Sequence, residues 1–190
     1  MAEFAFTLDP KPLLGGVDLM VGQNRIVELD ELAIVSVATP LGGDENLAKA
    51  LKTGWNISVP EPTLSSAEGD MRAVRSGADQ LLLIFPHDTP NAEAIVQSKL
   101  NGAGYTTDQT DNWLVLEVSG PDVASALERL SPVDLSLSAF PDGANARTVM
   151  EHMGALVICI GADRFLLMSA SSSAASFLHA VETSFAYVIP

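Results

Sequence analysis

The chain has 190 residues, of which 24 are acidic and 10 are basic, so its formal net charge at pH 7 is -14. Hydrophobic residues make up 47% of the sequence, which excludes an intrinsically disordered chain, and the length suffices for a substantial buried core. The acidic balance disfavours binding to a nucleic-acid backbone, because the basic residues are scattered and form no patch that would attract phosphates.

The sequence contains no recognisable membrane span or targeting peptide and has one cysteine. The apolar runs are too short to span a bilayer, and the opening MAEFAFTLDPKP resembles neither a signal peptide nor a transit peptide. The single cysteine, Cys159, lies in an apolar run that is typical of a buried strand. These features predict a cytoplasmic protein. The mean hydropathy of +0.25 is high for this net charge, so we expect another polypeptide to cover part of the surface.

Residues 1–30 are interrupted by proline and glycine and show no sustained period, which predicts an irregular N-terminal arm. The first half of the fold, residues 31–105, opens with a strand over 32–37. A helix over 44–55 follows, because Leu47, Leu51 and Trp55 fall on one helical face. A loop over 59–70 leads to a hairpin of strands 71–75 and 81–85, and a second helix begins at Pro90.

The second half, residues 106–190, repeats this order. The pattern predicts a strand over 113–118, a helix over 122–130, strands over 147–150, 156–160 and 165–168, and a last helix over 172–187. The letters repeat as well. VSVATP at 35–40 parallels LEVSGP at 116–121, and GADQLLLIFP at 77–86 parallels GADRFLLMSA at 161–170.

This repetition predicts an α+β fold of two similar strand-helix-strand-strand-helix halves packed as one unit. Each half can bury a sheet face only by packing against the other, so we expect the halves to share one core.

Residues with catalytic potential are few. The chain has no nucleophilic serine motif and no glycine-rich phosphate loop, and the three histidines have no metal-ligand spacing. His87 and His179 are expected to be solvated, and His152, beside Glu151 in a turn between strands, is the strongest candidate of the three.

Carboxylate pairs arise by chance in a chain with so many acids. Asp108 and Asp111 flank a turn before Trp113, and such turns favour aspartate for structural reasons. Glu117 alternates with Val115 on one strand face, so that face is either exposed to solvent or part of an interface. From the residues alone, the sequence predicts an acidic α+β domain with no visible active site.

Several short motifs nevertheless occur in an ordered series over about residues 71–185. They are AVRSG at 73–77, TDQTD at 107–111, SGP at 119–121, P-x-D-L at 132–135, A-F-P-x-G at 139–143 and GAD at 161–163. In this order they resemble the gamma subunit of heterotetrameric sarcosine oxidase. More distantly, they resemble the folate-binding aminomethyltransferases of the glycine cleavage T-protein group.

The resemblance implies a fold like the N-terminal domain of the T-protein and a non-catalytic role. The complex of that family demethylates sarcosine oxidatively to glycine and passes the one-carbon unit to tetrahydrofolate. The family implies that FAD, FMN, NAD and tetrahydrofolate are held by the other subunits, so we expect no cofactor, metal or catalytic residue in this chain. T-proteins place an acid shortly after a turn like Met153-Gly154, whereas residues 155–158 here are apolar.

The leading hypothesis is therefore a structural subunit that packs against flavoprotein subunits, with neither nucleic acid nor membrane as partner. Its interface is expected to include Leu13, Leu14, Glu117, Phe140 and Tyr187. A related N-methyl amine dehydrogenase could use a similar chain. The sequence is also compatible with a homo-oligomer of unknown role, or with a stand-alone folate-binding protein in which Glu117 or Asp108 would line a pocket between the halves.

Overall fold

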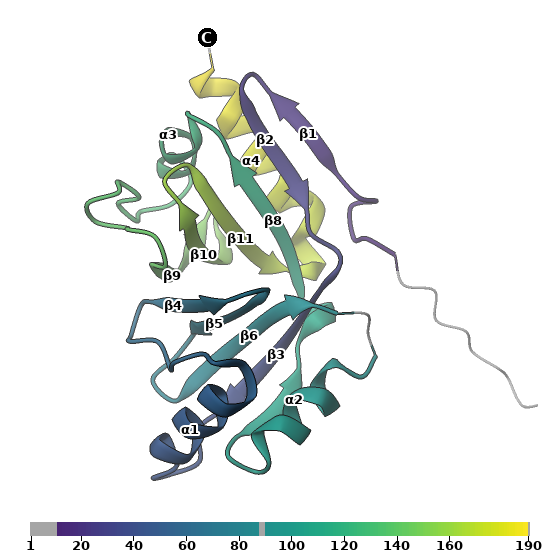
Figure 1. The fold of residues 1–190 in the computed structure, drawn as a ribbon. Coiled ribbons are helices and arrows are strands. Elements are labelled where there is room, and N and C mark those ends of the chain that lie inside the picture. The colour runs from purple at the N-terminus through teal and green to yellow at the C-terminus, as the bar shows by residue number, and fades with distance from the viewer. Residues whose placement is uncertain (1–10, 88–89, 190) are drawn as a thin grey trace, which may run out of the picture.

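Two antiparallel sheets face each other in the computed structural model, which describes residues 11–87 and 90–189 (Figure 1). The larger sheet has the strand order β1-β2-β8-β11-β10-β9, and the smaller has the order β4-β5-β6-β3-β7. The larger sheet contains β1 (Asp18–Val21), β2 (Asn24–Glu28), β8 (Trp113–Ser119), β9 (Asn145–Met150), β10 (Met153–Gly161) and β11 (Arg164–Ala170). The smaller sheet contains β3 (Leu32–Ala38), β4 (Ser65–Glu68), β5 (Met71–Arg75), β6 (Gln80–Pro86) and β7 (Tyr105–Asp108).

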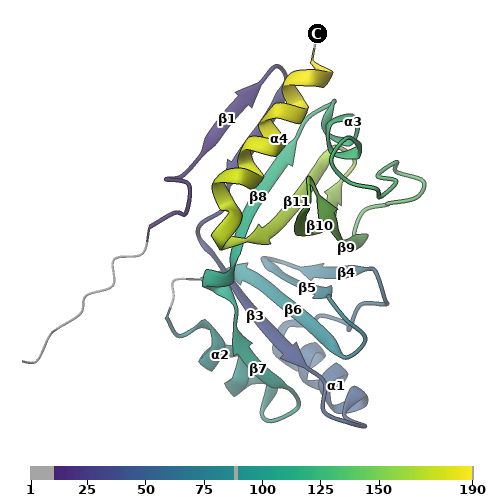
Figure 2. The same ribbon diagram turned by 180° about the vertical axis from the view of Figure 1, so that it is seen from behind.

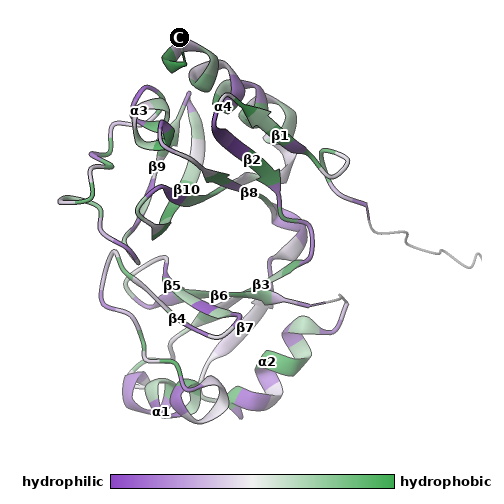
Figure 3. Cartoon of the chain, turned by 45° about the horizontal axis from the view of Figure 1, so that its top comes forward, coloured by the Kyte–Doolittle hydropathy of each residue, from purple (hydrophilic) through white to green (hydrophobic). Residues whose placement is uncertain are grey.

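Helices cover the outer faces of both sheets, so the chain forms four layers (Figures 2 and 3). The helices are α1 (Asp44–Trp55), α2 (Ala92–Leu100), α3 (Val123–Glu128) and α4 (Ala174–Val188), with 3-10 turns η1 (Thr110–Asn112) and η2 (Ser171–Ser173). α3 and α4 pack on the larger sheet, where Phe177 and Phe185 of α4 are fully buried. α1 and α2 pack on the smaller sheet through residues such as Leu47 and Val96.

A third apolar cluster, which we call the inter-sheet core, lies between the two sheets. Ile34 and Leu82 of the smaller sheet meet Val115 and Leu166 of the larger sheet in this cluster. The expectation of a single shared core is therefore wrong. The central strands have apolar residues at successive positions, as in Leu81–Leu82–Leu83–Ile84, so each sheet buries both of its faces.

The strand pairing confirms that the halves are similar. Val35 on β3 pairs with Leu83 on β6. Leu116, which lies 81 residues after Val35, pairs with Leu167, which lies 84 residues after Leu83. The repeated letters in the sequence thus occupy equivalent positions in the same register, and β9-β10-β11-β8 matches β4-β5-β6-β3 in order.

The N-terminal arm is the main correction to the expected elements. Residues 1–10 lie outside the described part, but residues 18–28 form the β1–β2 hairpin, and β2 pairs with β8. The buried Glu28 carboxylate accepts hydrogen bonds from the backbone N–H groups of Leu14 and Gly16, at 2.9 and 2.8 Å. The arm is therefore part of the second half rather than an irregular lead-in.

Two further strands were not expected from the sequence. β4 lies within the expected loop over 59–70, and β7 spans the expected boundary at residue 105, so the first half extends to Asp108. Both are short edge strands, in which one neighbour supplies all of the pairing. The predicted helix over 44–55 matches α1, and the predicted strand over 113–118 matches β8 to within one residue.

Candidate functional site

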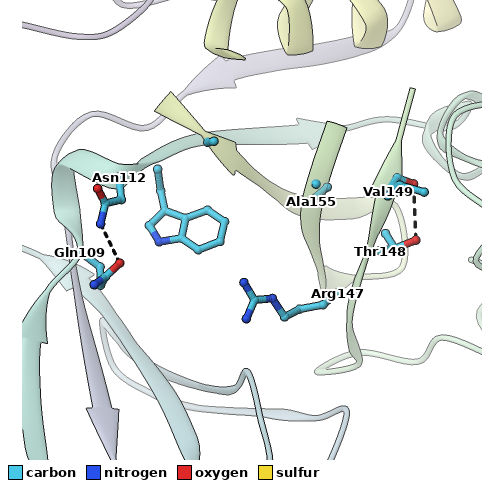
Figure 4. Close-up of a pocket in the computed structure, with 9 residues that line it drawn as sticks. Gln109, Asn112, Arg147, Thr148, Val149 and Ala155 are labelled. Atoms are coloured by element: carbon cyan, nitrogen blue, oxygen red, sulfur yellow. Dashed lines mark hydrogen bonds between the residues drawn. The ribbon is translucent and has the colours of Figure 1, made fainter. Parts of the chain in front are cut away.

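A cavity of about 680 Å³ lies beside the larger sheet, between Arg147 to Val149 of β9 and the turn at η1 with Asn112 (Figure 4). Strands β8 to β11 and the turn at η1 supply its lining: Gln109, Asn112, Trp113, Arg147, Thr148, Val149, Gly154, Ala155 and Ala170. The side-chain amides of Gln109 and Asn112 are joined by a hydrogen bond of 2.7 Å, which fixes one wall.

Arg147 supplies the positive charge of this cavity. It stands opposite Leu156 on the neighbouring strand, and cross-strand partners point to the same face of a sheet. Because Leu156 belongs to the inter-sheet core, Arg147 also faces the space between the sheets. Figure 4 shows its side chain extending into the cavity. The Arg147 side chain has no hydrogen bond or ion pair within residues 11–87 and 90–189.

Arg147 also borders a smaller cavity of about 260 Å³, which it shares with Arg75 and Asn145. Buried side-chain donors accompany both cavities. The indole Nε1 of Trp113 and the amide Nδ2 of Asn145 are buried and have no acceptor within the described part of the chain. A buried donor without an acceptor costs about 1–3 kcal/mol, so both positions favour an added acceptor.

Neither cavity has an aspartate or glutamate in its described lining, although the chain has 24 acids. The resemblance to T-proteins leads one to expect an acid after Met153-Gly154, and Ala155 at that position lines the larger cavity. The lining can therefore bind a carbonyl or an anionic group, but it offers no carboxylate to act as a general base.

A second arginine, Arg72, lies partly buried on the inter-sheet face of the smaller sheet, opposite Ile84. Its guanidinium Nη1 donates to Ser65 Oγ at 2.9 Å. Burial lowers the pKa of Arg72, and the nearby Asp142 acts in the opposite direction. Arg72 is thus held between the sheets by a hydroxyl and not by a carboxylate.

Cys159 is a buried strand thiol, as the sequence predicts, and is 0% exposed. Burial raises its pKa, and its Sγ donates to the Gly161 carbonyl at 3.2 Å. The backbone hydrogen bond with Gly161 acts in the opposite direction and lowers the pKa, but burial is the larger influence, so Cys159 does not have the character of a nucleophile.

The carboxylates singled out in the sequence have local structural roles. Asp108 accepts a hydrogen bond from the backbone N–H of Thr110 at 2.9 Å. Glu117 pairs with Arg164 at 3.0 Å. Neither lines the cavities that contain Arg147, so the structure does not place them where the folate-binding hypothesis requires them. Asp111 lines a separate small cavity beside the arm.

The histidines are distributed over two places. His87 Nε2 lies 2.7 Å from Asn91 Oδ1, at the start of α2. His152 and His179 line one groove beside α4, a proximity that their separation in the sequence did not reveal. Within residues 11–87 and 90–189, no three His, Cys, Asp or Glu side chains form a group that could hold a metal ion.

The expected interface residues differ in accessibility. Leu13 and Tyr187 are exposed, by 50% and 72%. Leu14 is partly buried against the core under α4. Phe140 is only 6% exposed and stacks on Phe165, so most of its ring packs in the chain's own core.

Comparison with known proteins identifies the fold. No family model and no curated protein sequence matches the chain. Its structure superposes on a chain of the heterotetrameric sarcosine oxidase of Corynebacterium sp. U-96, solved in complex with pyrrole 2-carboxylate. The TM-score is 0.76 at 18% identity, over 86% of this chain and 84% of that chain. The chain has the fold of that sarcosine oxidase chain.

A second likeness is to aminomethyltransferase T of the glycine cleavage system from Bartonella henselae. The TM-score is 0.55 at 12% identity, over 81% of this chain and 44% of that chain. The present chain thus spans less than half of that transferase, whereas it matches the sarcosine oxidase chain over similar fractions of both. These likenesses confirm the general mixed α/β fold that the sequence motifs implied. None of the described helices is long and apolar enough to cross a membrane.

Proposed function

We propose that this chain is a structural subunit, without a catalytic site of its own, in a sarcosine oxidase-type complex in the cytoplasm. The observation that carries the proposal is the superposition over 86% and 84% of two chains of similar length, one of which belongs to a heterotetramer. A chain that matches most of the length of one chain of such an assembly is suited to the same place in it.

Two features of the surface support this role. Large apolar side chains are exposed on several elements, among them Leu13, Met20 and Leu41, and an interface with a permanent partner would cover such side chains. The cavities at Arg147 contain donors and no carboxylate, so they are suited to holding a group and not to proton transfer. In this proposal the flavins, NAD and tetrahydrofolate belong to the partner subunits.

Co-expression with flavoprotein subunits of a sarcosine oxidase tests the proposal. We expect this chain to purify in a stable complex with them, and its omission to reduce the yield of assembled, active complex. Full assembly and turnover without this chain would overturn the proposal. Purification of this chain from its own cells together with flavoproteins that oxidise a different N-methyl amine would assign it to the related dehydrogenases.

A further inference from the structure

A groove of about 580 Å³ lies beside α4, bounded by the residues that follow α3 and by the turn between β9 and β10. It brings together His152 and His179, two of the three histidines in the chain. It is separate from the cavities at Arg147, and the structural role proposed above does not require it.

Helix α4 presents a row of polar side chains to this groove. Ser176, His179, Thr183 and Tyr187 are spaced by three, four and four residues, so they lie on one face of the helix. None of these side chains has a hydrogen bond within the described part of the chain. The row therefore offers imidazole and hydroxyl groups to the groove without a competing intramolecular partner.

Arg129 faces this row from the end of α3. Its guanidinium lies over the ring of Tyr187, at 5.3 Å from the ring centroid. This cation–π contact occupies none of the guanidinium N–H donors, and Arg129 has no ion pair among the described residues. A planar guanidinium with free N–H donors can donate paired hydrogen bonds to a carboxylate or phosphate.

His152 is held at the groove by an unusual turn. Met150 and Met153 pair directly, so Glu151 and His152 form a two-residue hairpin loop. Both have positive φ, 45° and 68°, in positions that asparagine and glycine usually occupy. The backbone N–H of Glu151 donates to the Leu130 carbonyl at 3.1 Å, which ties the turn to the end of α3. Strain of this kind often accompanies a side chain that must be held in place for binding.

The groove is less acidic than the chain as a whole. One carboxylate, Glu151, lines it beside one guanidinium, Arg129, and two imidazoles, in a protein where acids outnumber bases by 24 to 10. Leu130, Met153 and Ala180 add an apolar surface beside these groups. We propose that this groove binds a small organic anion, with its carboxylate or phosphate on Arg129, His152 and His179 and its apolar body on Leu130, Met153 and Ala180.

Titration of the full-length, ¹⁵N-labelled chain with phenyl phosphate and, separately, with benzoate tests this proposal. We expect saturable shifts of the amides at 129–130, 151–153 and 176–187, with a Kd on the order of millimolar for such small probes. The probe with the lower Kd shows whether the groove prefers a phosphate or a carboxylate. Inorganic phosphate is expected to bind roughly tenfold more weakly, because it buries no apolar surface. The absence of saturable shifts at the groove with both aromatic anions would overturn the proposal.

Two variants test whether the anion binds specifically at the groove or responds only to the net charge of the protein. Arg129→Gln is expected to weaken binding by about tenfold or more, since hydrogen bonds to a charged group are among the strongest. Lys49→Gln removes the same charge from the exposed face of α1 and is expected to bind as the wild type does. Equal loss in both variants, or no loss in Arg129→Gln, would contradict a specific site. The positions of the shifted amides in the wild-type chain test where the anion binds without the need for any variant.

Discussion

Leu64 and Ala144 form an antiparallel bridge that joins the two halves of the chain. In the internal repeat, β9 begins 80 residues after β4, at Asn145 and Ser65. Ala144 is therefore the counterpart of Leu64, and each half meets the other through the same position. An approximate two-fold axis passes through this bridge.

The hydrogen bonds around the bridge have the same symmetry. Ser65 N donates to the Gly143 carbonyl at 2.7 Å, and Asn145 N donates to the Thr63 carbonyl at 2.7 Å. The two halves are thus fastened at their sheet edges by an exchanged pair of bonds, in addition to the inter-sheet core.

Gly143 allows this close approach. Its φ is +86°, and a Cβ at this position would lie 3.2 Å from the Ser65 carbonyl oxygen. Gly143→Ala is expected to lower the free energy of unfolding by about 1–2 kcal/mol, measured by urea denaturation. Gly102→Ala is the matched control, because Gly102 has a similar φ of +82° and a Cβ there meets nothing within 4 Å, so its effect should be smaller, about 1 kcal/mol. Equal effects of the two substitutions would show that the bridge does not constrain residue 143.

Asn24 tests whether the arm belongs to the second half. Its fully buried side chain accepts from the Asp122 N–H and donates to the Asp122 carboxylate, both at 2.9 Å, at the start of α3. Asn24→Ala is expected to lower the free energy of unfolding by about 1–2 kcal/mol, because it leaves the partly buried N–H of Asp122 without its acceptor. Arg25→Ala breaks only an exposed ion pair with Asp18 and should have a smaller effect. A larger effect of Arg25→Ala would contradict this account of the arm.

The repeat makes a less obvious prediction for Arg72. The residue 84 positions later is Leu156, which is fully buried in the inter-sheet core. Arg72→Leu is expected to raise the free energy of unfolding by about 1 kcal/mol, since a well-packed apolar side chain often stabilises a buried position more than a charge that has been removed from water. The reciprocal change, Leu156→Arg, should cost more than about 3 kcal/mol. Loss of stability in Arg72→Leu would show that the arginine is needed for folding.

Cys159 gives the stability a dependence on alkaline pH. Burial raises the pKa of the thiol in the folded chain, so the folded state retains its proton where the unfolded state loses it. The resulting stability is fully present below the unfolded thiol pKa of about 8.5. It is lost as the pH rises through the raised pKa of the folded thiol.

Thermal unfolding between pH 7 and 10 measures this effect, with Cys159→Ala as the comparison. We expect the melting temperature of the wild type to fall more steeply than that of the variant. The native thiol should also resist alkylation until the chain unfolds. Rapid alkylation of the folded chain would contradict the buried assignment.

The elements that could be predicted are those whose signal is local. Leu47 and Leu51 mark α1 by their helical spacing, and the repeated letters mark β3, β6, β8 and β11. The β1–β2 hairpin could not be recognised, because its stability comes from β8, about 90 residues away.

The cavities and grooves depend on the same long-range pairing. Trp113 and Arg147 line the same cavity only because β8, β11, β10 and β9 pair in that order. No spacing of residues in the sequence predicts this proximity. His152 and His179 likewise come together only when α4 packs beside the β9–β10 turn. The resemblance of short motifs indicated the fold, but the lining residues required the three-dimensional structure.

The most direct test of the structural role is the native mass of the assembly that contains this chain. We expect native mass spectrometry of the chain, purified by a tag from its own cells, to show a hetero-oligomer in which it accompanies flavin-carrying polypeptides. A chain found only as a monomer, or only with copies of itself, would contradict the account.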